Sequence, residues 1–170
     1  MSDSQPAKHV EDDEKAREKV LEIARSMHVC MVTVADGTSA LLSRPMTPQR
    51  VTDEGEVLFL IDTTAEQASQ ITAHPAVNLA FVDGSSWLSI SGRGKVIRDQ
   101  ALVNELWTAA AEAWFPEGPD DSRLGVLRVR GKSAEYWDTP GGRIATVISF
   151  IKAKATGNTF DADNETVQLR

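Results

Sequence analysis

The chain has 170 residues, of which 41% are hydrophobic and 25% are charged, and its formal net charge is −7. This length suits one domain with a sizeable core. The acidic balance disfavours a broad basic face for nucleic acid, and no apolar run is long enough to cross a bilayer. A single cysteine, Cys30, excludes an intrachain disulfide and a cysteine cluster for zinc. Because Cys30 lies in the apolar run V-C-M-V-T-V, we expect a buried, inert thiol.

The start of the chain predicts a tail followed by a helix. Residues 1–9 are expected to be a disordered tail, and residues 10–170 one domain. The first residues are polar and contain no apolar signal region, which favours a cytoplasmic protein. Apolar residues then recur at helical spacing across residues 11–27 and predict an amphipathic helix: Ala16, Val20, Ile23, Ala24 and Met27. His9, His28 and His74 are scattered without ligand spacing, so no metal site is expected.

Six strands follow, with two helices between them. Asp36-Gly37 separates two apolar runs and predicts a hairpin of residues 28–35 and 38–44. Further strands are predicted at residues 56–61, 77–82, 87–98 and 124–137. A helix that begins at residues 62–64 is expected to end at His74-Pro75, and Asp99 is expected to be the N-cap of another helix. Strands in hairpin order with helices at the corners predict a mainly β, α+β fold built on a six-stranded antiparallel barrel.

The C-terminal part predicts another helix, at about residues 143–156. Its apolar stripe comprises Ile144, Val147, Ile148, Ile151 and Ala155, and Lys152 and Lys154 lie near its end. A basic amphipathic helix is compatible with a membrane surface. With only two lysines and an acidic tail after it, packing on the barrel or on a partner chain is favoured instead, and no membrane contact is expected.

Before Arg44-Pro45-Met46, apolar and polar residues alternate as in a strand. At Arg44 the sequence changes abruptly from core-forming residues to a cation and a rigid ring. Proline has no backbone N–H, so Pro45 must lie at a sheet edge or where the strand ends. An arginine there offers a planar fork of donors for a carboxylate, a phosphate or a polarised ring carbonyl. The alternative is an ordinary surface arginine.

Asp62-Thr63-Thr64 opens a helix and allows two interpretations. Thr63 with Glu66, and Thr64 with Gln67, have the spacing of a capping box. The free N–H groups and positive dipole end of a helix start, with two hydroxyl donors, also suit an anion.

Three other patterns carry no chemistry. S-G-R-G-K at residues 91–95 lacks the third glycine of a dinucleotide loop and is interpreted as a strand bend or bulge. Ser43 and Ser91 have no histidine near them in sequence, so a hydrolase triad has no support. The pairs Asp12-Asp13 and Asp120-Asp121 are interpreted as solvated charges.

Several motifs in order resemble the general stress protein family of pyridoxamine 5'-phosphate oxidase-like flavoproteins. They are S-R-P-M-T at residues 43–47, L-F-L-I-D-T-T at 58–64, W-L-S-I-S-G-R-G at 87–94, A-W-F-P-E-G-P-D-D at 113–121, S-A-E-Y-W-D at 133–138 and I-K-A-K-A-T-G at 151–157. The resemblance implies a split barrel that binds FMN at a homodimer interface. It implies flavin contacts from Arg44, Pro45, Met46, Thr47, Ile61, Asp62, Thr63, Thr64, Gln67 and Trp87, with Trp114 approaching from the partner chain.

One departure from the family concerns the phosphate. The family commonly has serine and lysine where this chain has Ala65 and Gln67. Losing a charge-assisted contact costs about 1.5–3 kcal/mol, so we expect weaker FMN binding unless another cation, such as Arg50, substitutes. The expected function is a cytoplasmic FMN-binding redox protein with a small-molecule redox partner and no evident pyridoxamine phosphate site. The alternative is a non-enzymatic flavin-binding or cofactor-free stress protein.

Overall fold

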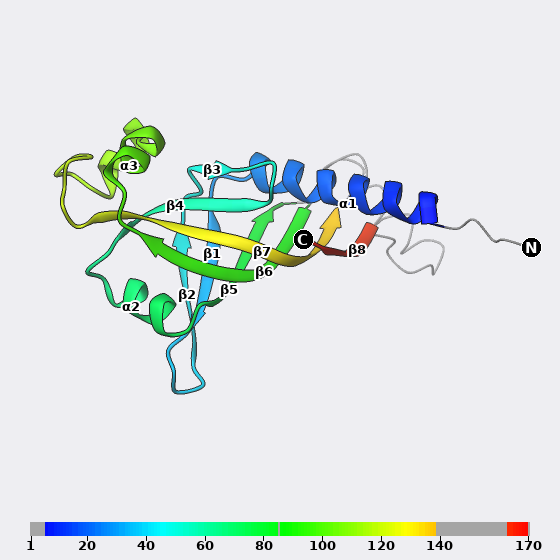
Figure 1. Ribbon diagram of the computed structural model, residues 1–170, viewed down its shortest axis with the longest axis horizontal. Helices are drawn as coiled ribbons and strands as arrows, with labels where there is room; N and C mark the ends of the chain where they lie inside the picture. The colour runs from blue at the N-terminus through cyan, green and yellow to red at the C-terminus, as the bar shows by residue number, and fades with distance from the viewer. Residues whose placement is uncertain (1–5, 85, 139–162, 170) are drawn as a thin grey trace, which may run out of the picture.

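A mainly antiparallel sheet with three α-helices forms the fold (Figure 1). The structure is a computed structural model that describes residues 6–84, 86–138 and 163–169. The helices are α1 (Pro6–Ser26), α2 (Glu66–Ala73) and α3 (Gln100–Leu106), with a 3₁₀ turn, η1 (Ala109–Ala113). The strands are β1 (Cys30–Ala35), β2 (Leu41–Met46), β3 (Arg50–Val51), β4 (Glu56–Asp62), β5 (Ala76–Asp83), β6 (Ser86–Ile97), β7 (Leu124–Asp138) and β8 (Asp163–Gln168). None of the helices described is long and apolar enough to cross a membrane.

The sheet runs in the order β2-β1-β5-β6-β7-β4-β3, and β8 pairs with β7. All its pairings are antiparallel. The path is open, with β2 and β3 at its two ends. The expected fold class is confirmed, and the six strands predicted from the sequence are β1, β2, β4, β5, β6 and β7.

Three features of the chain differ from the expectation or lie outside it. Helix α1 begins at Pro6, before the expected start at residue 11, and proline suits the first helical position because its missing N–H has no partner to lose there. Strands β3 and β8 were not predicted, because β3 has only two residues and β8 lies in a polar tail. The predicted helix at residues 143–156 lies outside the described residues.

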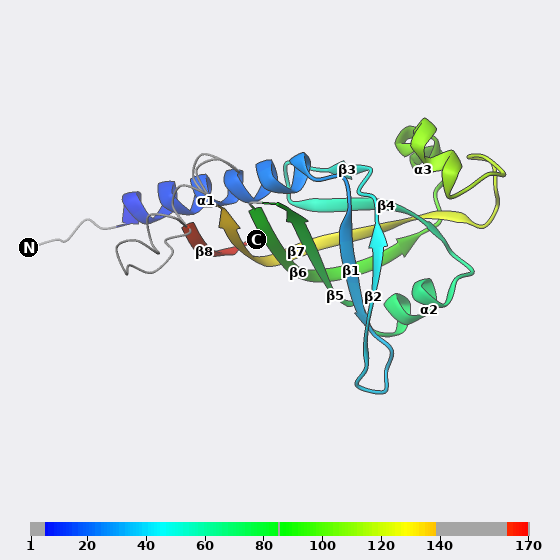
Figure 2. The ribbon, with the colours of Figure 1, turned by 180° about the vertical axis from the view of Figure 1, so that it is seen from behind.

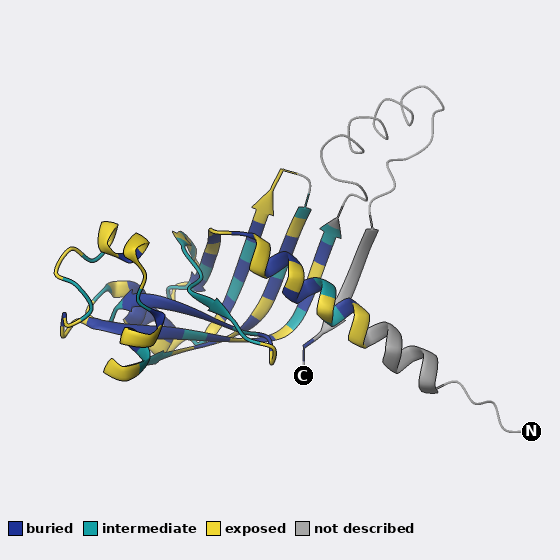
Figure 3. Cartoon of the chain, turned by 90° about the horizontal axis from the view of Figure 1, so that it is seen from above, coloured by how far each residue is buried: buried dark blue, intermediate teal, exposed yellow. Residues whose placement is uncertain are grey.

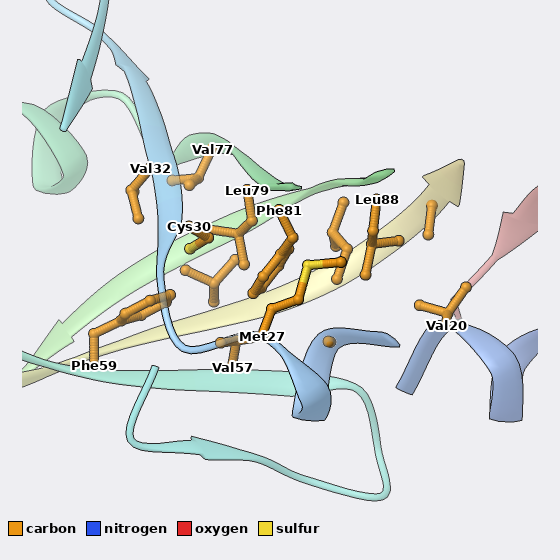
Figure 4. Close-up of a cluster of buried hydrophobic side chains, with 14 of the residues drawn as sticks. Val20, Met27, Cys30, Val32, Val57, Phe59, Val77, Leu79, Phe81 and Leu88 are labelled. Carbon is orange, nitrogen blue, oxygen red and sulfur yellow. The ribbon is translucent and has the colours of Figure 1, made fainter. Parts of the chain in front are cut away.

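The main core lies between the strands and under α1. Val57 and Phe59 of β4 face Val32 of β1 and the side chains of β5 and β6 (Figure 4). The predicted stripe of α1 is confirmed: Ala16, Val20, Ile23, Ala24 and Met27 are all buried in this cluster. Figure 3 shows α1 lying across the sheet, whose strands carry buried and exposed residues in alternation.

A second, smaller core forms on the opposite face of β4. Leu58 and Leu60 point there and pack with Val103 and Leu106 of α3 and with residues at the start of β7. Successive side chains of a strand point to opposite faces, so β4 contributes alternately to the two cores. Five consecutive residues of β4 are therefore buried.

The β1–β2 hairpin is confirmed, and it projects beyond the rest of the sheet (Figure 2). Its loop is longer than two residues: the Asp36 carboxylate accepts hydrogen bonds from Thr38 N at 2.7 Å and Ala40 N at 3.2 Å. Gly37 has φ +88°, and a Cβ there would lie 2.7 Å from His74 Nε2. The loop thus packs against the end of α2, and only glycine fits at this contact.

The bend predicted for S-G-R-G-K is also confirmed. The pairing of β6 with β7 shifts register between Ser91 and Gly92. A Cβ at Gly92 would lie 2.3 Å from the carbonyl oxygen of Arg130. The glycine therefore allows two backbones to approach at a bulge, and it does not serve a phosphate loop.

Candidate functional site

A pocket of about 280 Å³ lies where the end of β2 approaches the end of β4, close to the opening of the sheet path. Its lining is mostly apolar and comes from four segments far apart in sequence. The lining residues are Val29, Pro45, Met46, Thr47, Leu60, Ile61, Asp62, Ala65, Gln67, Trp114 and Phe115. The structure thus brings together seven of the residues singled out from the sequence: Pro45, Met46, Thr47, Ile61, Asp62, Gln67 and Trp114.

The first wall is the end of β2. This strand continues through Pro45 to Met46, two residues beyond the expected end at Arg44. Pro45 is tolerated because β2 is an edge strand with β1 as its one neighbour in the sheet order. Arg44 does not line the pocket, and its Nη1 lies 3.4 Å from Gln70 Oε1 on α2. The strand-end arginine therefore reaches toward the helix that carries Gln67.

The second wall is the turn between β4 and α2, and here the predicted capping boxes are wrong. Helix α2 begins at Glu66, with Ala65 as its N-cap and no side-chain cap. Asp62 Oδ1 instead accepts hydrogen bonds from Thr64 N at 2.8 Å and Thr64 Oγ1 at 2.6 Å. Thr63 Oγ1 donates to the carbonyl oxygen of Arg123 at 2.9 Å. Both threonine hydroxyls are thus engaged within the protein, and neither residue lines the pocket.

The Asp62 carboxylate is held in its charged form. Hydrogen bonds from the Thr64 side chain and backbone lower its pKa, and the positive charge of Arg123 lowers it further. Asp62 therefore stays ionised at neutral pH. Among the described residues that line the pocket, it is the one ionisable side chain.

The start of α2 supplies the polar end of the pocket. Ala68 N and Ser69 N donate to the carbonyl oxygen of Ala65, so the N–H groups of Glu66 and Gln67 precede the first helical hydrogen bonds. The Gln67 side chain is 8% exposed, and its Nε2 lies 3.5 Å from the sulfur of Met46, a weak acceptor. This end of the pocket therefore presents hydrogen-bond donors without a formal positive charge.

Arg50 does not supply the missing charge. Its Nη1 lies 2.7 Å from Glu105 Oε1 in an ion pair, and it lines a different hollow, beside the end of α1. Arg50 therefore does not lie where it could replace the missing cation of the pocket.

The third wall is aromatic and comes from the segment after η1. Trp114 is 72% exposed at the pocket, and Phe115 packs partly against the second core. Trp114 lines the pocket of its own chain, and its expected approach to the flavin of a partner chain stays a prediction. One copy of the chain thus has both aromatic residues at its own pocket.

Trp87 is not brought to the pocket. It lies on β6 opposite Val82 of β5 and Trp137 of β7, and it is 38% exposed. Phe115, Val29 and Leu60 line the pocket but were not singled out from the sequence. Ala65, noted in the sequence as a departure from the family, lines it as well. Among the missed residues, Phe115 carried a signal, because it follows Trp114 directly.

The comparisons with known proteins agree with this fold. A family model described as "pyridoxamine 5'-phosphate oxidase like" matches residues 15–161. The chain belongs to this family. The resemblance identified from the motifs is therefore confirmed.

Relatives within and around the family show how far the likeness extends. Protein bli-3 of Neurospora crassa is 27% identical over 139 residues, which span 75% of this chain but only 66% of the fungal protein. The general stress FMN/FAD binding protein of Xanthomonas citri has a TM-score of 0.65 at 26% identity, covering 76% of this chain and 93% of that one. A Clostridium acetobutylicum protein related to general stress protein 26 of Bacillus subtilis has a TM-score of 0.68 at 18% identity, covering 91% and 95%. The last likeness concerns the fold alone.

Proposed function

We propose that this protein binds FMN in the pocket between β2, β4 and α2 and is a flavin-dependent redox protein. The family membership and the similarity to the general stress FMN/FAD binding protein of Xanthomonas citri support a flavin. The observation that carries the proposal is the pocket itself, an apolar hollow with an uncapped helix start at one end. Such a combination suits a flat aromatic ring joined to an anionic chain.

The ring would be held by apolar and aromatic side chains. Pro45 and Met46 lie on one wall and Trp114 and Phe115 on another. An indole face stacks well on an aromatic ring, and its exposed position in the free protein leaves one side of Trp114 available. These side chains would orient the ring and exclude water from it.

The phosphate would be held mainly by uncharged donors. The backbone N–H groups at the start of α2 and the Gln67 amide are the donors at the polar end. Arg44 lies beside the same helix through its contact with Gln70, and it would add a positive charge from β2. Asp62 is negative, and Gln67 carries no charge to offset it. The phosphate should therefore bind more weakly than in a site with a lysine at position 67.

When bound, FMN supplies hydride or electron transfer with a small-molecule partner. The protein contributes orientation and electrostatics. Asp62 stays ionised, so it is an acceptor in this site and not a proton donor.

The proposal includes a cytoplasmic homodimer. Exposed apolar side chains lie on the outer face of β1, β5 and β6, where Met31 is 39%, Val82 63% and Trp87 38% exposed. A second copy on this face would remove them from water. Light scattering of the purified protein should give twice the chain mass, and a monomer at micromolar concentration would contradict this part.

Titration with FMN tests the proposal directly. The purified protein should be yellow, and FMN fluorescence should fall on binding at micromolar concentration. Arg44→Ala should weaken FMN binding by about tenfold or more, because a charge-assisted contact is lost. Arg50→Ala is the matched control, since Arg50 also lies on a strand but pairs with Glu105 away from the pocket. A colourless wild-type protein that leaves FMN fluorescence unchanged would overturn the proposal.

The alternative is a flavin-binding protein without turnover. This alternative is supported by the described residues that line the pocket, because none of them is a lysine, an arginine or a histidine. Addition of NADH or NADPH to the loaded protein distinguishes the two: bleaching of the flavin absorbance supports an enzyme, and unchanged absorbance supports a carrier.

A further inference from the structure

Asp121 and Arg123, which follow the segment that carries Trp114 and Phe115, form an ion pair between a buried carboxylate and a half-exposed guanidinium. Asp121 Oδ1 accepts hydrogen bonds from Arg123 N at 2.9 Å and Nε at 3.1 Å, and Oδ2 accepts from Nη2 at 2.8 Å. The Asp121 side chain is only 5% exposed. Arg123 Nη2 also lies 3.0 Å from Glu117 Oε1. The sequence had suggested that Asp120 and Asp121 are both solvated charges. Asp121 is instead buried and paired with Arg123.

Arg123 is joined to the β4–α2 turn through its backbone. Its carbonyl oxygen accepts hydrogen bonds from both Thr63 N at 2.8 Å and Thr63 Oγ1 at 2.9 Å. Thr63 is the neighbour of Asp62, which lines the pocket. Any movement of the Arg123 backbone is therefore transmitted to this wall of the pocket.

The same pair is joined to the aromatic wall. Glu117 lies two residues after Phe115, and Gly118 N donates to Phe115 O at 3.0 Å. Asp121 N in turn donates to Gly118 O at 3.3 Å. The segment that carries Trp114 and Phe115 thus ends in the Asp121–Arg123 pair.

The β4–α2 turn is packed tightly against the start of β7. A Cβ at Gly125 would lie 2.5 Å from Thr63 Cγ2 and 2.7 Å from Ile97 O. Trp114, by contrast, is largely exposed. Its position over the pocket therefore depends on how the segment behind it is anchored.

We propose that Asp121 and Arg123 are positioning residues that hold the Trp114–Phe115 wall at a fixed distance from the Asp62 wall. This inference rests on the flavin site proposed above. Neither side chain lines the pocket, so both act through the residues that do.

The test is Asp121→Asn, which keeps the size of the side chain and removes its charge. Glu105→Gln is the control, because it removes the carboxylate of another arginine pair, the one with Arg50. We expect FMN to bind the Asp121 variant about tenfold more weakly and the control as tightly as wild type. Far-UV circular dichroism checks that both variants fold, and Arg123→Lys, which keeps charge but loses the fork, should give a weakening in the same direction.

A double-mutant cycle separates positioning from general damage. In the Trp114→Ala background, Asp121→Asn should cost little further affinity, because the wall that it positions is already gone. Full additivity of the two changes would overturn the proposal, as would a wild-type affinity in the single variant.

Hydrogen exchange tests the same link without flavin. The Thr63 amide, which donates to Arg123 O, should exchange at least tenfold faster in Asp121→Asn than in wild type or Glu105→Gln. Unchanged exchange at Thr63 would overturn the positioning role. If wild type binds no FMN, the proposed function fails while this measurement still decides the role of the pair.

Discussion

Two helices of this chain begin in different ways: α3 has a side-chain cap, and α2 has none. At α3, the side chain of Asp99 accepts a hydrogen bond from Leu102 N at 3.0 Å. At α2, the N-cap is Ala65, which has no group to offer. Helix α3 packs on the second core, whereas α2 begins at the pocket.

The comparison shows how the N–H groups at the start of α2 stay free of a side-chain cap. Polar residues precede α2 as well, but Asp62 accepts hydrogen bonds from Thr64 and Thr63 donates to Arg123. These residues stabilise the turn and leave the first N–H groups of α2 without a side-chain cap. The capped start stabilises the fold, and the uncapped start has free N–H groups at the place where we propose that the ligand binds.

Giving α2 a cap of its own should have the largest effect. In Ala65→Asp, a carboxylate would compete with the ligand for the first N–H groups and add a negative charge beside Asp62. We expect FMN affinity to fall about a hundredfold while the free energy of unfolding rises by about 1 kcal/mol. Fluorescence titration and urea denaturation measure the two. Ala101→Asp, an exposed change in the first turn of α3, should leave FMN affinity unchanged, and equal losses in both variants would contradict the idea.

Adding a cation to the same helix start should act in the opposite direction. Gln67→Lys is expected to bind FMN about tenfold more tightly, because an ammonium group would face the phosphate. Riboflavin, which lacks the phosphate, should bind as it does to wild type. The ratio of the two dissociation constants is the measurement, with Ser69→Lys on the exposed side of α2 as the control. Tighter binding of both ligands would show that the phosphate lies elsewhere.

Removing the cap of α3 should affect stability alone. Asp99→Ala is expected to lower the free energy of unfolding by about 1 kcal/mol, measured by urea denaturation. FMN affinity should not change, since neither Asp99 nor any residue of α3 lines the pocket. A clear loss of affinity would mean that α3 is coupled to the pocket more closely than its contacts indicate.

A smaller effect is expected from the pH dependence of stability at Asp121. Hydrogen bonds and charge from Arg123 lower the pKa of Asp121 below its ordinary value. A carboxyl group with a lowered pKa stabilises the fold above its unfolded pKa, and this stabilisation disappears as pH falls through the folded value. The difference in Tm between wild type and Asp121→Asn should therefore be full at pH 6 and shrink below about pH 3.9. A difference that stays constant down to pH 3 would contradict this account.

Local signals in the sequence predicted the fold well. Asp36-Gly37, His74-Pro75 and Asp99 each act on their neighbours in the chain. They mark the hairpin turn, the end of α2 and the N-cap of α3 as predicted, although the turn is longer than two residues. The stripe of α1 was predictable because helical periodicity alone determines which side chains share a face. The inert thiol of Cys30 also fits, since burial raises its pKa to about 12.

The site was harder to predict, because its geometry depends on contacts between distant residues. The Thr63 hydroxyl bonds to Arg123, which lies 60 positions away, and no local pattern shows that this contact replaces a capping box. Trp87 was assigned to the flavin through resemblance. Strand pairing places it opposite Val82 and Trp137, outside the pocket of its own chain, and its contact with a flavin stays a prediction. Asp121 is a different case: its partner Arg123 is only two positions away, but the sequence does not show that this segment folds the guanidinium back onto the carboxylate.

The double burial of β4 also has a consequence for folding cooperativity. Val57 and Phe59 belong to the main core and Leu58 and Leu60 to the second, so neither core can lose β4 without exposing the other. We therefore expect a single unfolding transition, with coincident curves from probes in α1 and α3. Because Ile61 and Asp62 continue the same strand into the pocket, a bound ligand would raise the unfolding temperature of both cores together.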